Sequence, residues 1–216
     1  MSINTVLFDL DGTIADTLPL IKKTYAKVFE EMQIPWGNDD VMKMIGLPLR
    51  EIGRIMAGMG KEDEFFDNYQ KHYRGLHHNY IKVFPGIKEL LKKLLEKSFS
   101  LGIVTSKSKV GADLTIASIN LGDCFSVITT VDDTDQHKPH PEPVLHALKK
   151  LGKTPVEAIY VGDSPFDIEA GNRAGVTTIA VSWGMATVAE LKKHNPTFCV
   201  DTSEDLLKLI FSLGDI

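Results

Sequence analysis

The sequence has little cysteine and no arrangement of it that suggests a metal or a disulfide. Cys124 and Cys199 are the two cysteines in 216 residues, and neither belongs to a CxxC or CxH pair. Because a cysteine without a partner motif packs as a small hydrophobe, we expect two buried free thiols. The seven histidines show no HxxxH or HExxH spacing, which argues against a zinc site.

The chain also lacks an excess of positive charge and a long hydrophobic run. It has 24 Lys and Arg against 29 Asp and Glu, with no long block of either sign, so a nucleic-acid partner is not expected. No apolar run approaches the ~20 residues that cross a bilayer, which excludes a membrane-spanning helix. The N-terminal MSINTVLFDL has no basic region and is interpreted as a buried strand of a cytoplasmic protein.

What the chain does contain is typical of a globular protein. It is 43% hydrophobic and 25% charged, and no segment is dominated by Pro, Gly or Ser. Since single domains usually have ~100–200 residues, the length allows one core or a core with a smaller appended lobe.

Short apolar runs alternate along the chain with amphipathic stretches. The first run, at 3–9, ends in an acidic turn with a glycine, as a buried parallel strand does. The alternation predicts an α/β fold, a parallel sheet with helices on both faces. The other predicted strands are 99–104, 125–131, 157–161, 176–181 and a weaker one at 197–200. The predicted helices among them are 86–97, 108–120, 142–151, 166–174, 186–194 and 203–213.

Residues 16–82 interrupt this alternation, because they contain no convincing strand. Prolines and glycines punctuate the stretch, and Pro85 with Gly86 marks the return to the sheet. We therefore expect a helical cap domain at 16–82, inserted into a core domain formed by 1–15 and 83–216. The helices predicted in the cap are 17–33, 39–45, 49–58 and 62–80.

Asp9 and Asp11 stand on either side of one residue in FDLDGT, at the carboxyl end of the first predicted strand. Ligands of open α/β sheets bind at that end, and the spacing keeps both side chains near one face while the chain is extended. Carboxylates this close repel one another, and a divalent cation such as Mg²⁺, which prefers oxygen ligands, removes the conflict. The alternative is that the pair caps the next helix.

A second acidic pair, Asp163 and Asp167 in GDSPFD, follows the strand predicted at 157–161 and opens a helix. A negative charge at a helix N-terminus is favoured by about 0.3–1 kcal/mol. Capping therefore explains one of these acids more easily than both.

Thr105 and Ser106 follow the strand predicted at 99–104 and lead into a helix, where hydroxyls and backbone N–H groups can hold an anion. Ordinary capping by Ser106 or Ser108 is the alternative. Lys138, in HKPHPEP, precedes prolines that restrict the local backbone. Taken alone, this lysine is typical of a solvated side chain.

In the order of these features the sequence resembles the haloacid dehalogenase superfamily, over essentially its whole length. Four motifs match: DLDGT at 9–13, Thr105 in IVTSK, Lys138 in HKPHPEP, and GDSPFD at 162–167. The helical stretch after the first motif is similar to the C1 cap of that superfamily. The resemblance implies a Rossmann-like core and a Mg²⁺-dependent phosphatase that forms and hydrolyses an aspartyl-phosphate.

The resemblance also implies roles for the acids. Asp9 would be the nucleophile, and Asp11 would protonate the leaving oxygen and later activate water. Mg²⁺ would be held by Asp9, the backbone carbonyl of Asp11 and Asp163. Asp167 would act through a metal-bound water or orient Lys138.

The remaining motif residues would bind the phosphoryl group. By resemblance, Thr105 and Ser106 would hold its oxygens, and Lys138 would offset the negative charge that gathers in the transition state.

Within the superfamily the pattern most resembles the phosphoglycolate phosphatase and pyrophosphatase branches. The partner implied is thus a small phosphorylated metabolite or pyrophosphate, and a monomer and a homodimer are both compatible with the sequence. Since cap residues select the leaving group, Arg50, after the GLPL turn, is our candidate contact for a carboxylate or second phosphate. Arg74, His77 and His78 are alternatives.

Three other functions share parts of this sequence pattern. Sugar phosphomutases such as β-phosphoglucomutase share this core and cap, but they carry a His ten residues after the acid/base Asp and have DGV. This chain has Ile21 and DGT there, and both departures favour hydrolysis. A non-catalytic phosphate-binding protein is the other alternative, whereas a phosphoaccepting signalling module would be shorter and would lack the cap.

Overall fold

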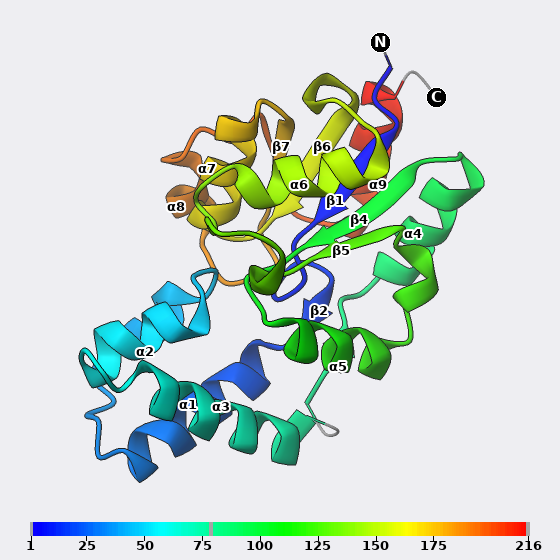
Figure 1. Cartoon of the computed structure of the whole chain (residues 1–216). Helices are drawn as coiled ribbons and strands as arrows, with labels where there is room; N and C mark the ends of the chain where they lie inside the picture. The colour runs from blue at the N-terminus through cyan, green and yellow to red at the C-terminus, as the bar shows by residue number, and fades with distance from the viewer. Residues whose placement is uncertain (1, 78–79, 215–216) are drawn as a thin grey trace.

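The core of the protein is a six-stranded parallel sheet. The computed structural model describes residues 2–77 and 80–214, and Figure 1 shows the sheet in the upper part of the molecule. The strand order is β5-β4-β1-β6-β7-β8, and every neighbouring pair is parallel. The predicted fold is therefore confirmed. The strands are β1 Thr5–Phe8, β4 Ser100–Val104, β5 Val127–Thr129, β6 Ala158–Gly162, β7 Thr177–Val181 and β8 Phe198–Val200.

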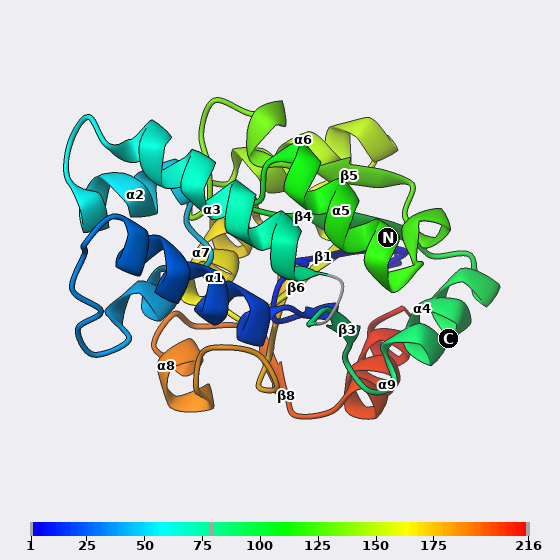
Figure 2. The ribbon, with the colours of Figure 1, turned by 90° about the horizontal axis from the view of Figure 1, so that it is seen from below.

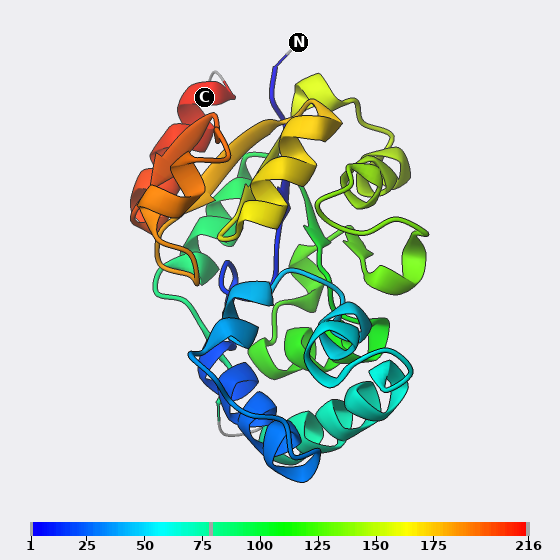
Figure 3. The same cartoon turned by 90° about the vertical axis from the view of Figure 1, so that its left-hand side faces the viewer.

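Helices cover both faces of the sheet because the central strands are apolar on both sides. Val6 and Phe8 of β1 pack against a first group of helices on one face of the sheet. Leu7 packs against a second group on the other face. Figure 3 shows the sheet between these layers. The first group is α4 Ile87–Glu96, α5 Lys109–Ile119 and α9 Ser203–Leu213. The second is α6 Glu142–Leu151 and α7 Pro165–Ala174, and the short α8 Val188–Lys192 packs beside α7.

Residues 18–76, between β2 Ala15–Asp16 and β3 Lys82–Val83, form a separate helical layer over the carboxyl ends of the strands (Figures 1 and 2). It has its own apolar core, in which several aromatic rings pack together. The rings of Tyr25 and Tyr69 are 5.0 Å apart, and those of Tyr69 and Tyr73 are 5.7 Å apart. The helices are α1 Leu18–Glu31, the 3₁₀ helix η1 Asp40–Met44, α2 Leu49–Ala57 and α3 Glu62–Leu76.

Two short strands that the sequence did not predict lie where the chain passes between the two lobes. β2 Ala15–Asp16 and β3 Lys82–Val83 pair antiparallel, with Ala15 opposite Val83. Two residues are too few to show an alternating pattern, so the ribbon has no sequence signature. It joins the outgoing chain to the returning chain through the pairs Ala15–Val83 and Asp16–Lys82.

Both cysteines are free, as predicted. We expected both to be buried, but each is only partly buried. Cys124 ends the 3₁₀ helix η3 Gly122–Cys124, and Cys199 lies on β8, the edge strand of the sheet, so each is only partly covered. Partial burial raises the pKa of both thiols. Within the described residues no helix combines the length and apolarity that a bilayer crossing requires.

Matched glycine substitutions test the packing of α7 on the sheet. A Cβ at Gly171 would come 2.5 Å from Thr178 Cγ2 and 3.3 Å from the Tyr160 ring, whereas a Cβ at Gly75 in α3 meets no atom of the described residues within 4 Å. We expect Gly171→Ala to lower the free energy of unfolding by about 1–3 kcal/mol. Gly75→Ala is expected to be neutral or to raise it by up to about 1 kcal/mol. Urea unfolding of both variants measures this, and equal stabilities would contradict the packing.

Candidate active site

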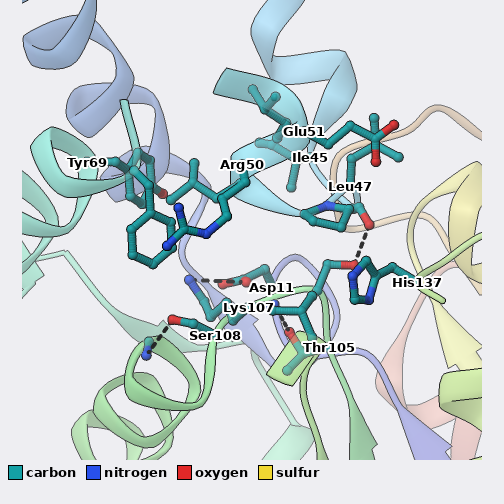
Figure 4. A pocket seen from close by; sticks show the side chains of 18 of the residues that line it. Asp11, Ile45, Leu47, Arg50, Glu51, Tyr69, Thr105, Lys107, Ser108 and His137 are labelled. Atoms are coloured by element: carbon teal, nitrogen blue, oxygen red, sulfur yellow. Dashed lines mark hydrogen bonds and ion pairs between the residues drawn. The ribbon is translucent and has the colours of Figure 1, made fainter. Parts of the chain in front are cut away.

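A cavity of about 560 Å³ lies between the carboxyl ends of the strands and the cap helices. Figure 4 shows side chains from both lobes around it. Asp9 and Asp11 follow β1, and Thr105 and Ser106 follow β4, so the loops after neighbouring strands supply its floor. The cap contributes the opposite wall through α1, the loop at 45–48, α2 and α3.

Three buried carboxylates come together beneath this cavity. Asp9, Asp163 and Asp167 each place an oxygen within 4.8 Å of the others, and they are 6%, 2% and 0% exposed. Asp163 follows β6, and Asp167 lies in the first turn of α7, where its Oδ2 accepts hydrogen bonds from the Ser164 N–H and hydroxyl. The capping box formed with Ser164 thus fixes the position of Asp167.

Lys138 is buried among these acids. Its Nζ is 2.8 Å from Asp9 Oδ1, 2.6 Å from Asp167 Oδ1 and 3.2 Å from Tyr160 Oη. Burial alone would lower the pKa of this lysine, but Asp167 and Asp9 together raise it well above its usual value. The ammonium group therefore stays charged and links the ends of β1 and β6.

One ammonium does not neutralise three carboxylates, and the pKa values show the imbalance. Burial raises the pKa of Asp9 well above its usual value, although Lys138 partly opposes the shift. Burial and the neighbouring Asp167 raise the pKa of Asp163 to about 7, against the stabilising N–H of Met185. A divalent cation fits this charge and this all-oxygen donor set, as Mg²⁺ requires.

A glycine keeps this cluster open. A Cβ at Gly12 would lie 2.1 Å from Asp163 Oδ2, and its φ of +84° is one that other residues rarely adopt. The glycine of DLDGT therefore lets the first loop approach Asp163. Thr13, next in the chain, donates a hydrogen bond of 3.0 Å to Asp163 Oδ1.

The Asp11 carboxylate makes different contacts from those of Asp9. Its Oδ1 accepts a hydrogen bond of 2.5 Å from the Thr17 hydroxyl, and its Oδ2 is 3.2 Å from Lys107 Nζ. It lines the cavity under the cap, outside the three-carboxylate cluster. Two adjacent acids are thus held in separate environments.

The two hydroxyl side chains after β4 contact different lobes. Thr105 is buried and its Oγ1 accepts from the Lys107 N–H at 3.2 Å. The Ser106 hydroxyl donates to the Gly46 carbonyl in the cap. Ser108, not Ser106, caps α5, accepting from the Gly111 N–H.

The cap residues singled out in the sequence lie around or outside the cavity. Arg50 lines it, but the Arg50 guanidinium pairs with Asp63 and lies 4.2 Å over the Phe66 ring, with the side chain 53% exposed. Arg74 is exposed, and its carbonyl is 2.7 Å from His77 Nδ1. His78 lies outside the described residues.

Three further side chains touch this machinery without having been singled out in the sequence. Tyr160 of β6 donates to Asp167 Oδ1 at 2.9 Å and contacts Lys138. Lys107 and Tyr73 are 3.2 Å apart, Nζ to Oη. The sequence could have identified Lys107 as a site residue, because it directly follows the hydroxyl pair. It could not have identified Tyr73, which resembles an ordinary residue on the apolar face of a cap helix.

The comparisons with known proteins agree with the motif pattern. The model of the haloacid dehalogenase-like hydrolase family matches residues 6–181. A protein of Oceanobacillus iheyensis named pyrophosphatase PpaX is 35% identical over 210 residues, covering 97% of this chain and 98% of its own. The resemblance inferred from the four motifs is therefore confirmed.

Solved structures share the fold over nearly the whole chain. A predicted phosphatase from Clostridium acetobutylicum has a TM-score of 0.88 at 25% identity, covering 99% of this chain and 100% of its own. A predicted phosphoglycolate phosphatase from Haemophilus somnus has a TM-score of 0.85 at 24% identity, with 97% and 98% covered.

In protein freed of divalent metal by a chelator, we expect Asp163 to shape the pH dependence of stability. Its pKa is about 7 when folded and about 3.9 when unfolded. Between these values the unfolded state binds fewer protons, so the free energy of unfolding falls as the pH rises. Thermal unfolding from about pH 5 to 8 measures the slope. Asp163→Asn removes this titration and should flatten the profile; an unchanged slope would contradict the assignment.

Proposed function

Because this chain belongs to the haloacid dehalogenase-like hydrolase family, we propose that it is a Mg²⁺-dependent phosphatase that works through an aspartyl-phosphate on Asp9. The observation that carries the proposal is the different surroundings of two acids in one loop. Asp9 lies in the buried cluster with Lys138, and Asp11 faces the cavity below the cap. One acid is placed to attack phosphorus and the other to exchange protons.

Asp9 is the nucleophile in this proposal. Lys138 holds its Oδ1 at 2.8 Å, which leaves Oδ2 to form the bond to phosphorus while the bond to the leaving oxygen breaks. Asp11 gives its proton to that leaving oxygen. The same carboxylate then takes a proton from the water that attacks phosphorus and releases Asp9.

Asp9, Asp163 and the backbone carbonyl of Asp11 would hold Mg²⁺, which when bound offsets the charge of the phosphoryl group. Both Asp167 oxygens already accept hydrogen bonds, from Tyr160 and from Ser164. Asp167 therefore serves mainly to orient Lys138, and any contact with the metal goes through water.

The transferring phosphoryl oxygens would contact Thr105, Ser106 and Lys138. Ser106 donates its hydroxyl hydrogen to the Gly46 carbonyl of the cap. Binding of phosphate by that hydroxyl would therefore exchange a contact between the lobes for a contact with substrate. The cap and the phosphate site are coupled through this one side chain.

The substrate class we propose is pyrophosphate or a small phosphate ester such as phosphoglycolate. The name of the Oceanobacillus relative supports pyrophosphate. The cavity wall carries Ile21, which is 3% exposed, at the position where the resembling phosphomutases have a histidine. An apolar side chain cannot exchange protons with a sugar hydroxyl, and this favours hydrolysis over isomerisation.

Replacing the nucleophile should abolish turnover. We expect Asp9→Asn to lower phosphate release by about 1,000-fold or more, because an amide does not attack phosphorus. Asp16→Asn, which removes an acid of β2 that has no assigned role, is the control and should keep near-normal activity. Borohydride reduction during turnover, followed by peptide mass spectrometry, should detect homoserine at position 9 in the wild type. Near-full turnover of Asp9→Asn would end the covalent scheme.

Removal of divalent metal should abolish phosphate release, and added Mg²⁺ should restore it. Asp163→Asn should require a higher Mg²⁺ concentration for half-maximal rate, since the variant loses a charged ligand. Titration of pyrophosphate hydrolysis with Mg²⁺ measures both. Full activity in the presence of a strong chelator would contradict the metal requirement.

A further inference from the structure

Lys107 is a largely covered cation at the boundary between the lobes that the proposed chemistry leaves without a role. Its side chain is 12% exposed, and it lines the cavity beside Asp11 (Figure 4). Tyr73 lines the same cavity. Burial alone would lower the pKa of this lysine, but the Asp11 carboxylate and the Tyr73 hydroxyl raise it above its usual value. The lysine is therefore charged when substrate arrives.

The position of Lys107 follows from contacts with both lobes. Its Nζ is 3.2 Å from Asp11 Oδ2, 3.2 Å from Tyr73 Oη and 4.5 Å from the centre of the Tyr73 ring. Tyr73 is 1% exposed, and its hydroxyl is 3.1 Å from Thr115 Oγ1 in the core. An ammonium group has three donor hydrogens, so these two oxygen partners leave one for a ligand.

Of the other cations near the site, Arg54 lines the cavity from an exposed position on α2, and two have carboxylate partners. Lys138 lies beneath the cavity between Asp9 and Asp167. Arg50 pairs with Asp63 and is half exposed. Since the proposed proton donor Asp11 must face the leaving oxygen, a cation 3.2 Å from Asp11 lies on the leaving-group side of the phosphorus.

We propose that Lys107 determines specificity by binding a negatively charged group on the leaving group, either the second phosphate of pyrophosphate or a carboxylate. Without it, the cavity-lining Glu51 and Glu62 would repel such a leaving group. The inference rests on the proposed phosphatase function and assigns one part of its substrate selection. The recognition chemistry is the same for the two anions, and the substrates tested distinguish them.

The test compares two alkyl phosphates of similar size, one with a charged leaving group and one with a neutral leaving group. These are 2-phosphoglycolate and 2-hydroxyethyl phosphate, with pyrophosphate as the third substrate, all assayed on the Mg²⁺-loaded enzyme. Lys107→Met removes the charge and keeps a similar stem, and Lys107→Arg keeps the charge. Lys109→Met is the matched control, because that lysine is 70% exposed and pairs only with Asp113 in the described chain.

We expect Lys107→Met to lower kcat/KM by about 10- to 100-fold more for the preferred charged substrate than for 2-hydroxyethyl phosphate, the range for a hydrogen bond to a charged group. Lys107→Arg should keep part of the preference, and Lys109→Met all of it. Should Lys107→Met fail to fold, Tyr73→Phe, which removes one contact of the ammonium, should reduce the same preference several-fold.

The outcomes distinguish a failure of this inference from a failure of the proposed phosphatase function. Equal losses on both alkyl phosphates would overturn it and would mean that Lys107 acts only by positioning Asp11. An unchanged preference in Lys107→Met, or in Tyr73→Phe where that variant replaces it, would overturn it as well. Absence of phosphate release from all three substrates by the wild type would instead reject the proposed function. The charged substrate with the larger loss identifies the leaving group.

Discussion

The burial of the Lys138 ammonium among carboxylates is the interaction on which the rest of the site depends. It contacts Asp9 after β1, Asp167 at the start of α7 and Tyr160 within β6. Loss of one partner of a buried ion pair commonly costs about 3–5 kcal/mol, because the remaining charge is uncompensated. The ends of the central strands are therefore held in register by the same charges that are proposed to act on phosphate.

Burying these carboxylates together lowers the stability of the metal-free protein. The pKa values of Asp9 and Asp163 are raised by burial, so their ionised forms are held at the expense of folding free energy. Carboxylates forced together in this way bind a cation more strongly than dispersed ones, since binding relieves their repulsion. The instability of the metal-free cluster and its affinity for a divalent ion have one physical origin.

The fold could be predicted because its signals are local. The apolar run before Asp9 and the turn after it identify β1, and the carboxyl ends of parallel strands must share one edge, so strand ends far apart in sequence could be expected to meet. The cysteines show the limit of this reasoning. Cys199 is only partly buried because it lies on an edge strand, and the hydrophobic pattern of a sequence does not reveal the order of strands in the sheet. The β2–β3 ribbon was equally invisible, at two residues a strand.

Some features of the candidate site could be predicted from the sequence, and others could not. Asp9, Lys138 and Asp167 lie together as their motif positions indicate, although their roles stay proposals. The partners of Lys107 could not be predicted, because the contact with Tyr73 depends on how the cap packs on the core. Arg50, the cap residue expected to bind substrate, is instead paired with Asp63, and residue spacing in the sequence does not reveal this pair.

Two contacts between the lobes explain how chemistry and selection can be separated in such a protein. The Ser106 hydroxyl reaches the Gly46 carbonyl, and the Lys107 ammonium reaches Tyr73, so adjacent residues of one core loop each hold a different part of the cap. A change in α3 would shift Lys107 relative to the leaving group, but it would not reach Lys138, which lies buried beneath the cavity. Leaving-group preference can therefore vary through the cap while the buried charges that hold the core remain as they are.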